Sequence, residues 1–217
     1  MRLFQFTIIL TSLYLPVIIE AASLTVSIKS TAGDKVENAV ITLSGKQKNT
    51  ITNKHNRTYI VDQIDKTFVP HVKVIPVGSQ VNFPNKDNIR HHVYSFSESK
   101  KFELPLYKGT PAKPVTFGRP GVVVLGCNIH DWMRGYVYVS DTPYFAKTDK
   151  SGNASIQNLP SGEFTLTIWH PQIIKNDIVK PSKVVFTRNE HKVINESINL
   201  KPLIKIRRSP AFRRRDY

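Results

Sequence analysis

Three side chains that can bind a soft metal ion lie within one stretch of seven residues. Cys127, His130 and Met133 have the spacing Cys-x2-His-x2-Met and stand between two apolar segments. A loop this short can bring a thiolate, an imidazole and a thioether to one point. Thiolate and thioether are soft ligands, and imidazole suits copper, zinc and iron. The spacing therefore predicts a metal site built largely from this loop.

A further imidazole is available upstream, where His91 and His92 begin a predicted strand. Adjacent strand residues point to opposite faces, so we expect only one of the two to face the metal. Two His, one Cys and a weak axial Met form the ligand field of a blue-copper electron-transfer site. Zinc prefers four nitrogen, sulfur or oxygen donors, among which a thioether is a poor one. The residues therefore predict one type 1 copper ion.

The scaffold for these ligands is predicted to be all-β. Helical periodicity is hard to find, and the chain instead shows short runs of Val, Ile, Thr, Tyr and Phe broken by Gly, Pro, Asn and Asp, a pattern typical of sandwiches and barrels. The predicted strands are Leu24–Ile28, Ala39–Leu43, Val72–Val77, Gln80–Phe83, His92–Phe96, Val115–Phe117, Val122–Leu125, Tyr136–Val139, Phe164–Trp169, Lys183–Phe186 and Lys192–Leu200.

The stretch Tyr59–Ser140 carries the motifs of a known family. An apolar strand is followed by a turn at Gly78, by Val-x-Phe at Val81–Phe83 and by Asn-x-Asp at Asn85–Asp87, and then comes His91. This succession resembles the early part of the cupredoxin pattern, in which the last position is the first copper ligand. The resemblance implies a Greek-key β-sandwich over residues 59–140.

The segment Gly126–Met133 resembles the late ligand loop of the same family, with the short spacing found in amicyanin and methylamine-utilisation-type cupredoxins. Aligned on Val93, the family's first ligand falls on His91, so the implied set is His91, Cys127, His130 and Met133. His92 stands where the family has an Asn that ties the two ligand loops together. Ile129 stands where relatives often have Pro.

The flanking segments 23–58 and 141–200 resemble the two parts of a transthyretin-like (prealbumin-like), carboxypeptidase-regulatory-type β-sandwich. The first part runs strand, glycine turn, strand, and the second contains Thr148–Gly152, Leu159–Gly162 and an alternating strand into Trp169. The polar stretch 45–58 is a suitable entry for an inserted domain. We therefore expect the cupredoxin segment to be inserted in the second sandwich. The alternative is one enlarged cupredoxin with an N-terminal hairpin and a C-terminal sandwich.

Residues 1–22 have the layout of a secretory signal peptide: a positive start, an uncharged run over Leu3–Ile19 and small residues at the end. The run contains polar residues and is shorter than the ~20 residues of a spanning helix. We expect cleavage after Ala21 or Ala22 and a periplasmic or secreted protein. A thiol in such a compartment is often oxidised, and metal ligation would protect Cys127.

Composition limits the partners. The formal net charge is +15, and residues 201–217 carry seven basic side chains and one acid, so we expect a disordered basic tail that could contact an anionic membrane surface. The positive body would attract redox partners with acidic docking surfaces. Base-reading features are absent, so no nucleic-acid partner is expected. A single Cys excludes an intrachain disulfide, a two-Cys zinc knuckle and a dinuclear copper site with bridging thiolates.

The sequence thus predicts an exported copper protein that carries single electrons and is not an enzyme. Catalysis by Cys127 with His130 would need an orienting group and an oxyanion loop, and neither is evident in the sequence. Two other functions stay open, namely copper trafficking or storage by the same ligands, and a metal-free structural or ligand-binding sandwich. We expect His71 and His170 to be structural or solvent-facing, and Trp132 to shield the metal, to form part of a docking surface, or simply to pack.

Overall fold

The computed structural model describes residues 21–45, 58–111, 113–174 and 179–202. This part of the chain contains seventeen β-strands and no helix, which confirms the all-β prediction. None of the described residues belongs to a helix of the length and hydropathy needed to cross a membrane. The predicted signal peptide except its last two residues, most of the stretch 45–58 and most of the basic tail lie outside the described residues.

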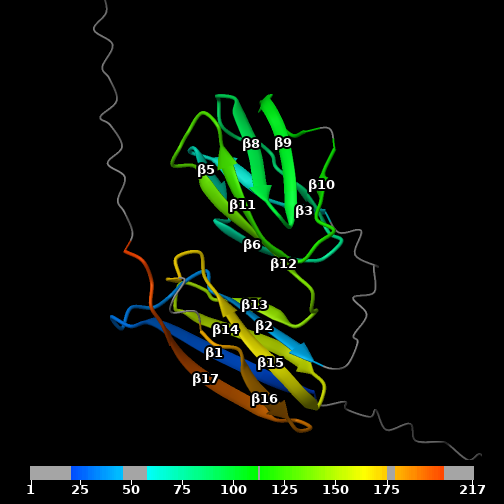
Figure 1. Cartoon of the computed structure of the whole chain (residues 1–217), viewed down its shortest axis with the longest axis vertical. Helices are drawn as coiled ribbons and strands as arrows, with labels where there is room; N and C mark the ends of the chain where they lie inside the picture. Colours follow the sequence, from blue (N-terminus) through cyan, green and yellow to red (C-terminus); the bar gives the residue numbers. More distant parts are fainter. Residues whose placement is uncertain (1–20, 46–57, 112, 175–178, 203–217) are drawn as a thin grey trace, which may run out of the picture.

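The strands form two blocks, each made of packed sheets (Figure 1). The outer block contains β1 (Ala22–Ser30), β2 (Val40–Gly45), β13 (Phe145–Lys147), β14 (Asn153–Leu159), β15 (Gly162–Trp169), β16 (Ser182–Phe186) and β17 (His191–Ile198). The middle block contains β3 (Thr58–Ile60), β4 (Asp62–Ile64), β5 (Thr67–Val69), β6 (Val72–Pro76), β7 (Gln80–Asn82), β8 (His91–Ser97), β9 (Lys100–Tyr107), β10 (Val115–Thr116), β11 (Gly121–Cys127) and β12 (Arg134–Ser140).

The outer block joins the two ends of the described chain. Its sheets have the orders β14-β1-β17 and β13-β2-β15-β16. β1 alternates apolar and polar residues, so that Leu24, Val26 and Ile28 are buried while Thr25 and Ser27 face outward. β1 pairs in parallel with β17, from Ser23 opposite His191 to Ser30 opposite Ile198. The N-terminal strands therefore belong to the same sheets as the C-terminal ones.

The middle block carries the predicted ligands. Its largest sheet has the order β6-β12-β11-β8-β9, and smaller sheets have the orders β10-β7-β3 and β4-β5. Thirteen buried residues form its core, among them Phe83, Phe117, Leu125, Cys127 and Met133. Two of the four predicted ligands therefore lie in the hydrophobic core itself, where packing fixes their positions.

The two blocks meet through aromatic side chains. Trp169, at the end of β15, has its ring centroid 5.7 Å from that of Tyr136 and 5.5 Å from that of Tyr138, both on β12. After β12, the hydroxyl of Thr142 donates a 2.6 Å hydrogen bond to the carbonyl oxygen of Leu43 on β2. Trp169 and Leu43 of the outer block therefore contact β12 and the segment that follows it.

Candidate metal centre

The loop between β11 and β12 folds as two consecutive tight turns. The amide of His130 donates to the carbonyl oxygen of Cys127 at 3.4 Å, and the amide of Met133 donates to the carbonyl oxygen of His130 at 2.9 Å. Side chains three residues apart in such turns lie on the same side. Cys127, His130 and Met133 are accordingly all buried, with exposed fractions of 3%, 9% and 1%.

Strand pairing brings His91 to this loop. β11 pairs antiparallel with β8, and Cys127 stands opposite Val93. His91 precedes Val93 by two residues, shares its face of the strand and is, like Val93, fully buried. As a result, Nδ1 of His91 lies 3.7 Å from Sγ of Cys127, and Nδ1 of His130 lies 3.6 Å from the same sulfur.

The donor set fits a metal ion. The ligand atoms of His91, Cys127 and His130 all lie within 4.8 Å of one another. In a trigonal site, sulfur and imidazole donors at about 2.3 and 2.0 Å from an ion stand about 3.7 Å apart. The observed separations of 3.7 and 3.6 Å match this spacing. Among the described residues, this is the one cluster of three or more His, Cys, Asp or Glu side chains that could hold an ion.

Asp87 fixes the tautomer of His91. Nε2 of His91 lies 2.7 Å from Oδ2 of Asp87. An ionised carboxylate can only accept, so Nε2 carries the proton and Nδ1 carries the lone pair that faces the sulfur of Cys127. A carboxylate that accepts from the outer nitrogen of a metal-binding imidazole orients the ring and raises its basicity. With Nε2 bonded to Asp87, Nδ1 is the atom of His91 that remains to bind a metal.

Backbone amides hold Asp87 in turn. The amide of Asp65 donates to Oδ1 of Asp87 at 2.7 Å, and the amide of Lys66 donates to Oδ2 at 2.9 Å. Burial opposes ionisation of Asp87, but the hydrogen bond from His91 and the two amides outweigh it, so the pKa of this carboxyl is lowered. Sequence analysis named Asp87 only as part of the Asn-x-Asp motif at Asn85–Asp87 and gave it no role at the metal site.

His130 links the buried sulfur to the surface. Burial lowers the pKa of His130, and electrostatic interaction with His91 and Lys66 lowers it further. The neutral form that binds metals is thereby favoured. Its ring lies 5.3 Å from that of Trp132, which is 43% exposed, and Ile129 in the same loop is 48% exposed. The loop thus places an exposed apolar ring beside this imidazole and a second exposed apolar side chain next to it in the sequence.

The structure separates the two adjacent histidines. His92 points to the opposite face of β8 from His91, and its Nε2 lies 2.8 Å from Oε1 of Glu103 on β9. The ring of His92 also contacts that of Tyr94 edge-on, at 6.2 Å between centroids. His91 therefore meets the sulfur, while His92 contacts Glu103 on the outer face of the sheet.

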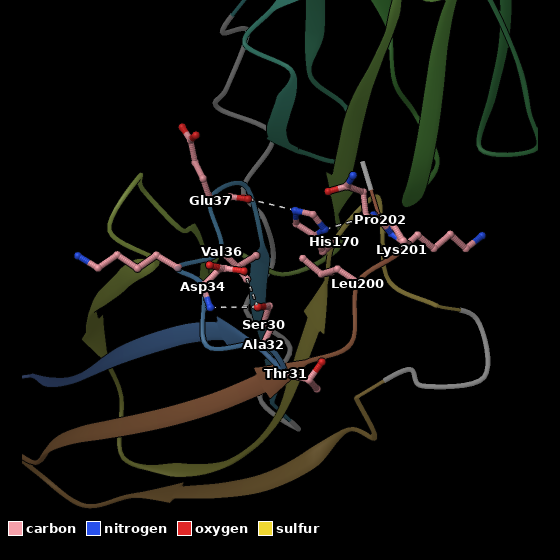
Figure 2. Close-up of a pocket in the computed structure, with 12 residues that line it drawn as sticks. Ser30, Thr31, Ala32, Asp34, Val36, Glu37, His170, Leu200, Lys201 and Pro202 are labelled. Atoms are coloured by element: carbon pink, nitrogen blue, oxygen red, sulfur yellow. Dashed lines mark hydrogen bonds between the residues drawn. The ribbon is translucent and has the colours of Figure 1, made fainter. Parts of the chain in front are cut away.

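His170 lines a hollow of about 450 Å³ in the outer block, but both of its ring nitrogens are hydrogen-bonded (Figure 2). Nε2 of His170 donates to the carbonyl oxygen of Glu37 at 3.1 Å, and Nδ1 accepts from the amide of Gln172 at 3.2 Å. Burial lowers the pKa of His170, which keeps the ring neutral in this role. The ring of His71 contacts Tyr136 edge-on at 5.4 Å, which is a packing contact near the joint between the blocks.

Comparisons with known proteins give partial matches to copper proteins. No family model matches the sequence, and no curated protein matches it either. Among solved structures, a copper-containing nitrite reductase from Thermus scotoductus SA-01 is 28% identical over 40% of this chain and 23% of that chain, with a TM-score of 0.37. This chain thus spans about a quarter of the reductase.

Two cupredoxin structures also match. A purple cupredoxin from Nitrosopumilus maritimus is 26% identical over 38% of this chain and 98% of its own, with a TM-score of 0.33. An amicyanin variant in its reduced Cu(I) form is 24% identical over 38% of this chain and 82% of its own, with a TM-score of 0.35. Each of these likenesses covers less than half of the present chain.

Proposed function

We propose that this chain is an exported type 1 copper protein that carries single electrons between redox partners. The observation that supports this most is the meeting of the Cys127 sulfur with Nδ1 of His91 and of His130 at 3.7 and 3.6 Å in a buried site. We propose Met133, buried in the same core cluster as Cys127, as the weak axial ligand. When bound, a copper ion would supply one-electron chemistry by alternating between Cu(I) and Cu(II).

The chain's own residues would keep the ligand geometry nearly constant during this exchange. Asp87 holds the His91 ring, the two turns of the loop hold His130 and Met133, and β11 holds Cys127 in the core. Ligands fixed by packing and hydrogen bonds need little rearrangement when the charge of the site changes. We propose that electrons enter and leave by way of His130, whose surroundings include exposed Ile129 and Trp132.

Nucleophilic catalysis is a weaker alternative for the same residues. Cys127, His91 and Asp87 have the order of a nucleophile, a base and an orienting acid. A nucleophile must reach its substrate, whereas Cys127 is 3% exposed and a second imidazole, that of His130, stands 3.6 Å from its sulfur. Two imidazoles around one buried thiolate suit a metal ligand set better than a catalytic dyad.

The deciding experiment is a visible and electron-spin-resonance spectrum of the copper-loaded protein. An intense visible band with reversible redox cycling is expected for the electron carrier. Colourless Cu(I) that exchanges readily with a chelator would favour copper trafficking or storage. A chain that binds no copper would favour a metal-free sandwich. The three outcomes separate the proposed function from its two rivals.

The adjacent histidines provide a matched test of the ligand set. His91→Gln is expected to abolish the visible band, because it removes the Nδ1 donor beside Cys127. His92→Gln removes an imidazole from the neighbouring position, but its contacts are with Glu103 and Tyr94 on the outer face, so the band should be retained. Absorption and copper stoichiometry measure both effects. Loss of colour in His92→Gln with retention in His91→Gln would overturn the assignment.

Met133→Leu tests the axial position. Leu is similar to Met in volume, so the core should lose less than about 1.5 kcal/mol in its free energy of unfolding. The potential of a blue-copper site is tuned by the axial ligand. We therefore expect a coloured variant with a raised reduction potential, measured by voltammetry. A potential identical to that of the unmodified chain would rule out Met133 as a ligand.

We propose a periplasmic or secreted location, because residues 1–22 have the layout of a signal peptide. Ala22 is the first residue of β1, and its side chain is 1% exposed in the core of the outer block. Cleavage after Ala21 would keep this residue, whereas cleavage after Ala22 would remove it, so we propose the former. For the outer block we propose a transthyretin-like support or binding role.

A further inference from the structure

An apolar groove lies on the outer face of the largest sheet of the middle block, away from the core that holds the ligands. It encloses about 330 Å³, and its lining includes Tyr94, Phe96, Ser97, Val124, Gly126 and Arg134. Phe96 is 79% exposed, more than any other large hydrophobic side chain among the described residues, and Val124 is 40% exposed. Such a cluster of exposed apolar side chains marks an interaction surface more often than a simple solvated face.

The floor of the groove passes directly over the residue before Cys127. Gly126 pairs with Tyr94 on one side and with Arg134 on the other. A Cβ on Gly126 would lie 2.7 Å from Cζ of Tyr94, so the Tyr94 ring rests on the glycine backbone. The rings of Tyr94 and Phe96 follow each other along β8 with centroids 5.0 Å apart. The groove is therefore one peptide bond from the thiol-bearing residue.

The charges around the groove are unbalanced. Lys101 stands directly opposite Phe96 in the strand pairing, and Arg134 lines the groove itself. Neither forms an ion pair within the part of the chain that the structure describes. Glu103 is the sole acid of β8, β9, β11 and β12, and it is paired with His92 at 2.8 Å. The face thus offers two unpaired cations beside an apolar surface.

We propose that this groove is a docking surface for the acidic face of a partner protein that inserts an apolar or aromatic side chain between Phe96 and Arg134. Tyr, Phe and Arg are the residue types enriched at protein interfaces, and a central aromatic anchor beside an Arg is typical of their strongest contacts. The residues that line the groove do not include Ile129 or Trp132 of the exposed loop around His130. The role of this docking in electron exchange near Cys127 rests on the proposed function. The existence of the docking surface does not depend on it.

A defined acidic peptide tests the surface without knowledge of the partner. The probe is a synthetic pentapeptide, Glu-Glu-Trp-Glu-Glu, titrated into the full chain in copper-free form and followed by amide NMR shifts. The largest shifts are expected at Phe96, Val124 and Gly126. Phe96→Ser and Arg134→Gln should each raise the peptide's Kd by about fivefold or more, and added salt should weaken binding. Replacing the Trp of the peptide with Ser should weaken it similarly.

A matched control separates the groove from general stickiness. Val193→Ser removes an apolar side chain that is 59% exposed on β17 of the outer block, and it should leave the Kd unchanged. Shifts centred on Ile129 and Trp132, no detectable binding, or equal losses in Val193→Ser and Phe96→Ser would overturn the proposal. The titration needs no copper, so its result stands apart from the spectrum that tests the electron carrier.

Discussion

Cys127→Ser is expected to abolish the intense visible absorption of the copper-loaded protein. The serine hydroxyl has nearly the shape of the thiol but cannot supply the soft thiolate that binds copper beside two imidazoles. The sulfur is the shared neighbour of His91 and His130 at 3.7 and 3.6 Å, so its removal takes away the centre of the set. Copper affinity should fall by more than the roughly 10–100-fold typical of outer-shell substitutions.

The measurements are an absorption spectrum and a chelator competition, with thermal unfolding of the copper-free forms as the control for folding. Cys127 is a small part of a core of thirteen buried residues, so the copper-free variant should remain folded. Cys127→Ala serves as a second variant that adds no hydroxyl to the core. A Cys127→Ser protein that stayed coloured would contradict the ligand assignment.

The central strands could be predicted from the sequence because they are unbroken runs of Val, Leu and Tyr next to glycines. Val122–Leu125 and Tyr136–Val139 were predicted and lie within β11 and β12. β9 was missed, since Lys100–Tyr107 carries two Lys, a Glu and a Pro, and it proves to be an edge strand of its sheet. Edge strands face solvent along one side and tolerate charge and Pro, so hydrophobic patterning alone does not reveal them.

The pairing of the strands is less accessible to sequence analysis. β14, another edge strand, was missed because its outward positions are polar. The parallel pairs of β1 with β17 and of β6 with β12 join distant segments, and nothing local in either strand specifies its partner. Alternation tells which residues of β8 share a face. It does not tell whether the face of His91 or the face of His92 points to the core.

The ligand loop was the most readable part of the site because its donors are close in sequence. The two tight turns place the side chains of Cys127, His130 and Met133 on one side of the loop, and this placement does not depend on distant strands. Asp87 was not predicted as a supporting residue, because its role depends on the hairpin turn at Asp65 and Lys66, which lies some twenty residues away. Hydrogen bonds across separate loops leave no local periodicity to detect.

Asp87→Asn is expected to weaken copper binding by about 10–100-fold, the usual effect of losing an outer-shell carboxylate. The carboxylate accepts hydrogen bonds from Nε2 of His91 and from the amides of Asp65 and Lys66. An Asn side chain has one oxygen for these three donors, and its NH₂ group facing His91 would favour the tautomer with the proton on Nδ1. That tautomer turns an N–H toward Cys127 in place of the lone pair that a metal needs.

Asp62→Asn is the matched control, because Asp62 lies in the neighbouring strand β4 and pairs with Lys86 at 2.9 Å without contacting His91. Chelator competition measures affinity, and the ¹⁵N shifts of the His91 ring in the copper-free chain report its tautomer, which a loss of folding stability alone would not reverse. We expect the tautomer and the affinity to change together in Asp87→Asn and neither to change in Asp62→Asn. An Asp87→Asn protein with unchanged affinity would show that packing of the ring in the core, where His91 is fully buried, suffices to orient it.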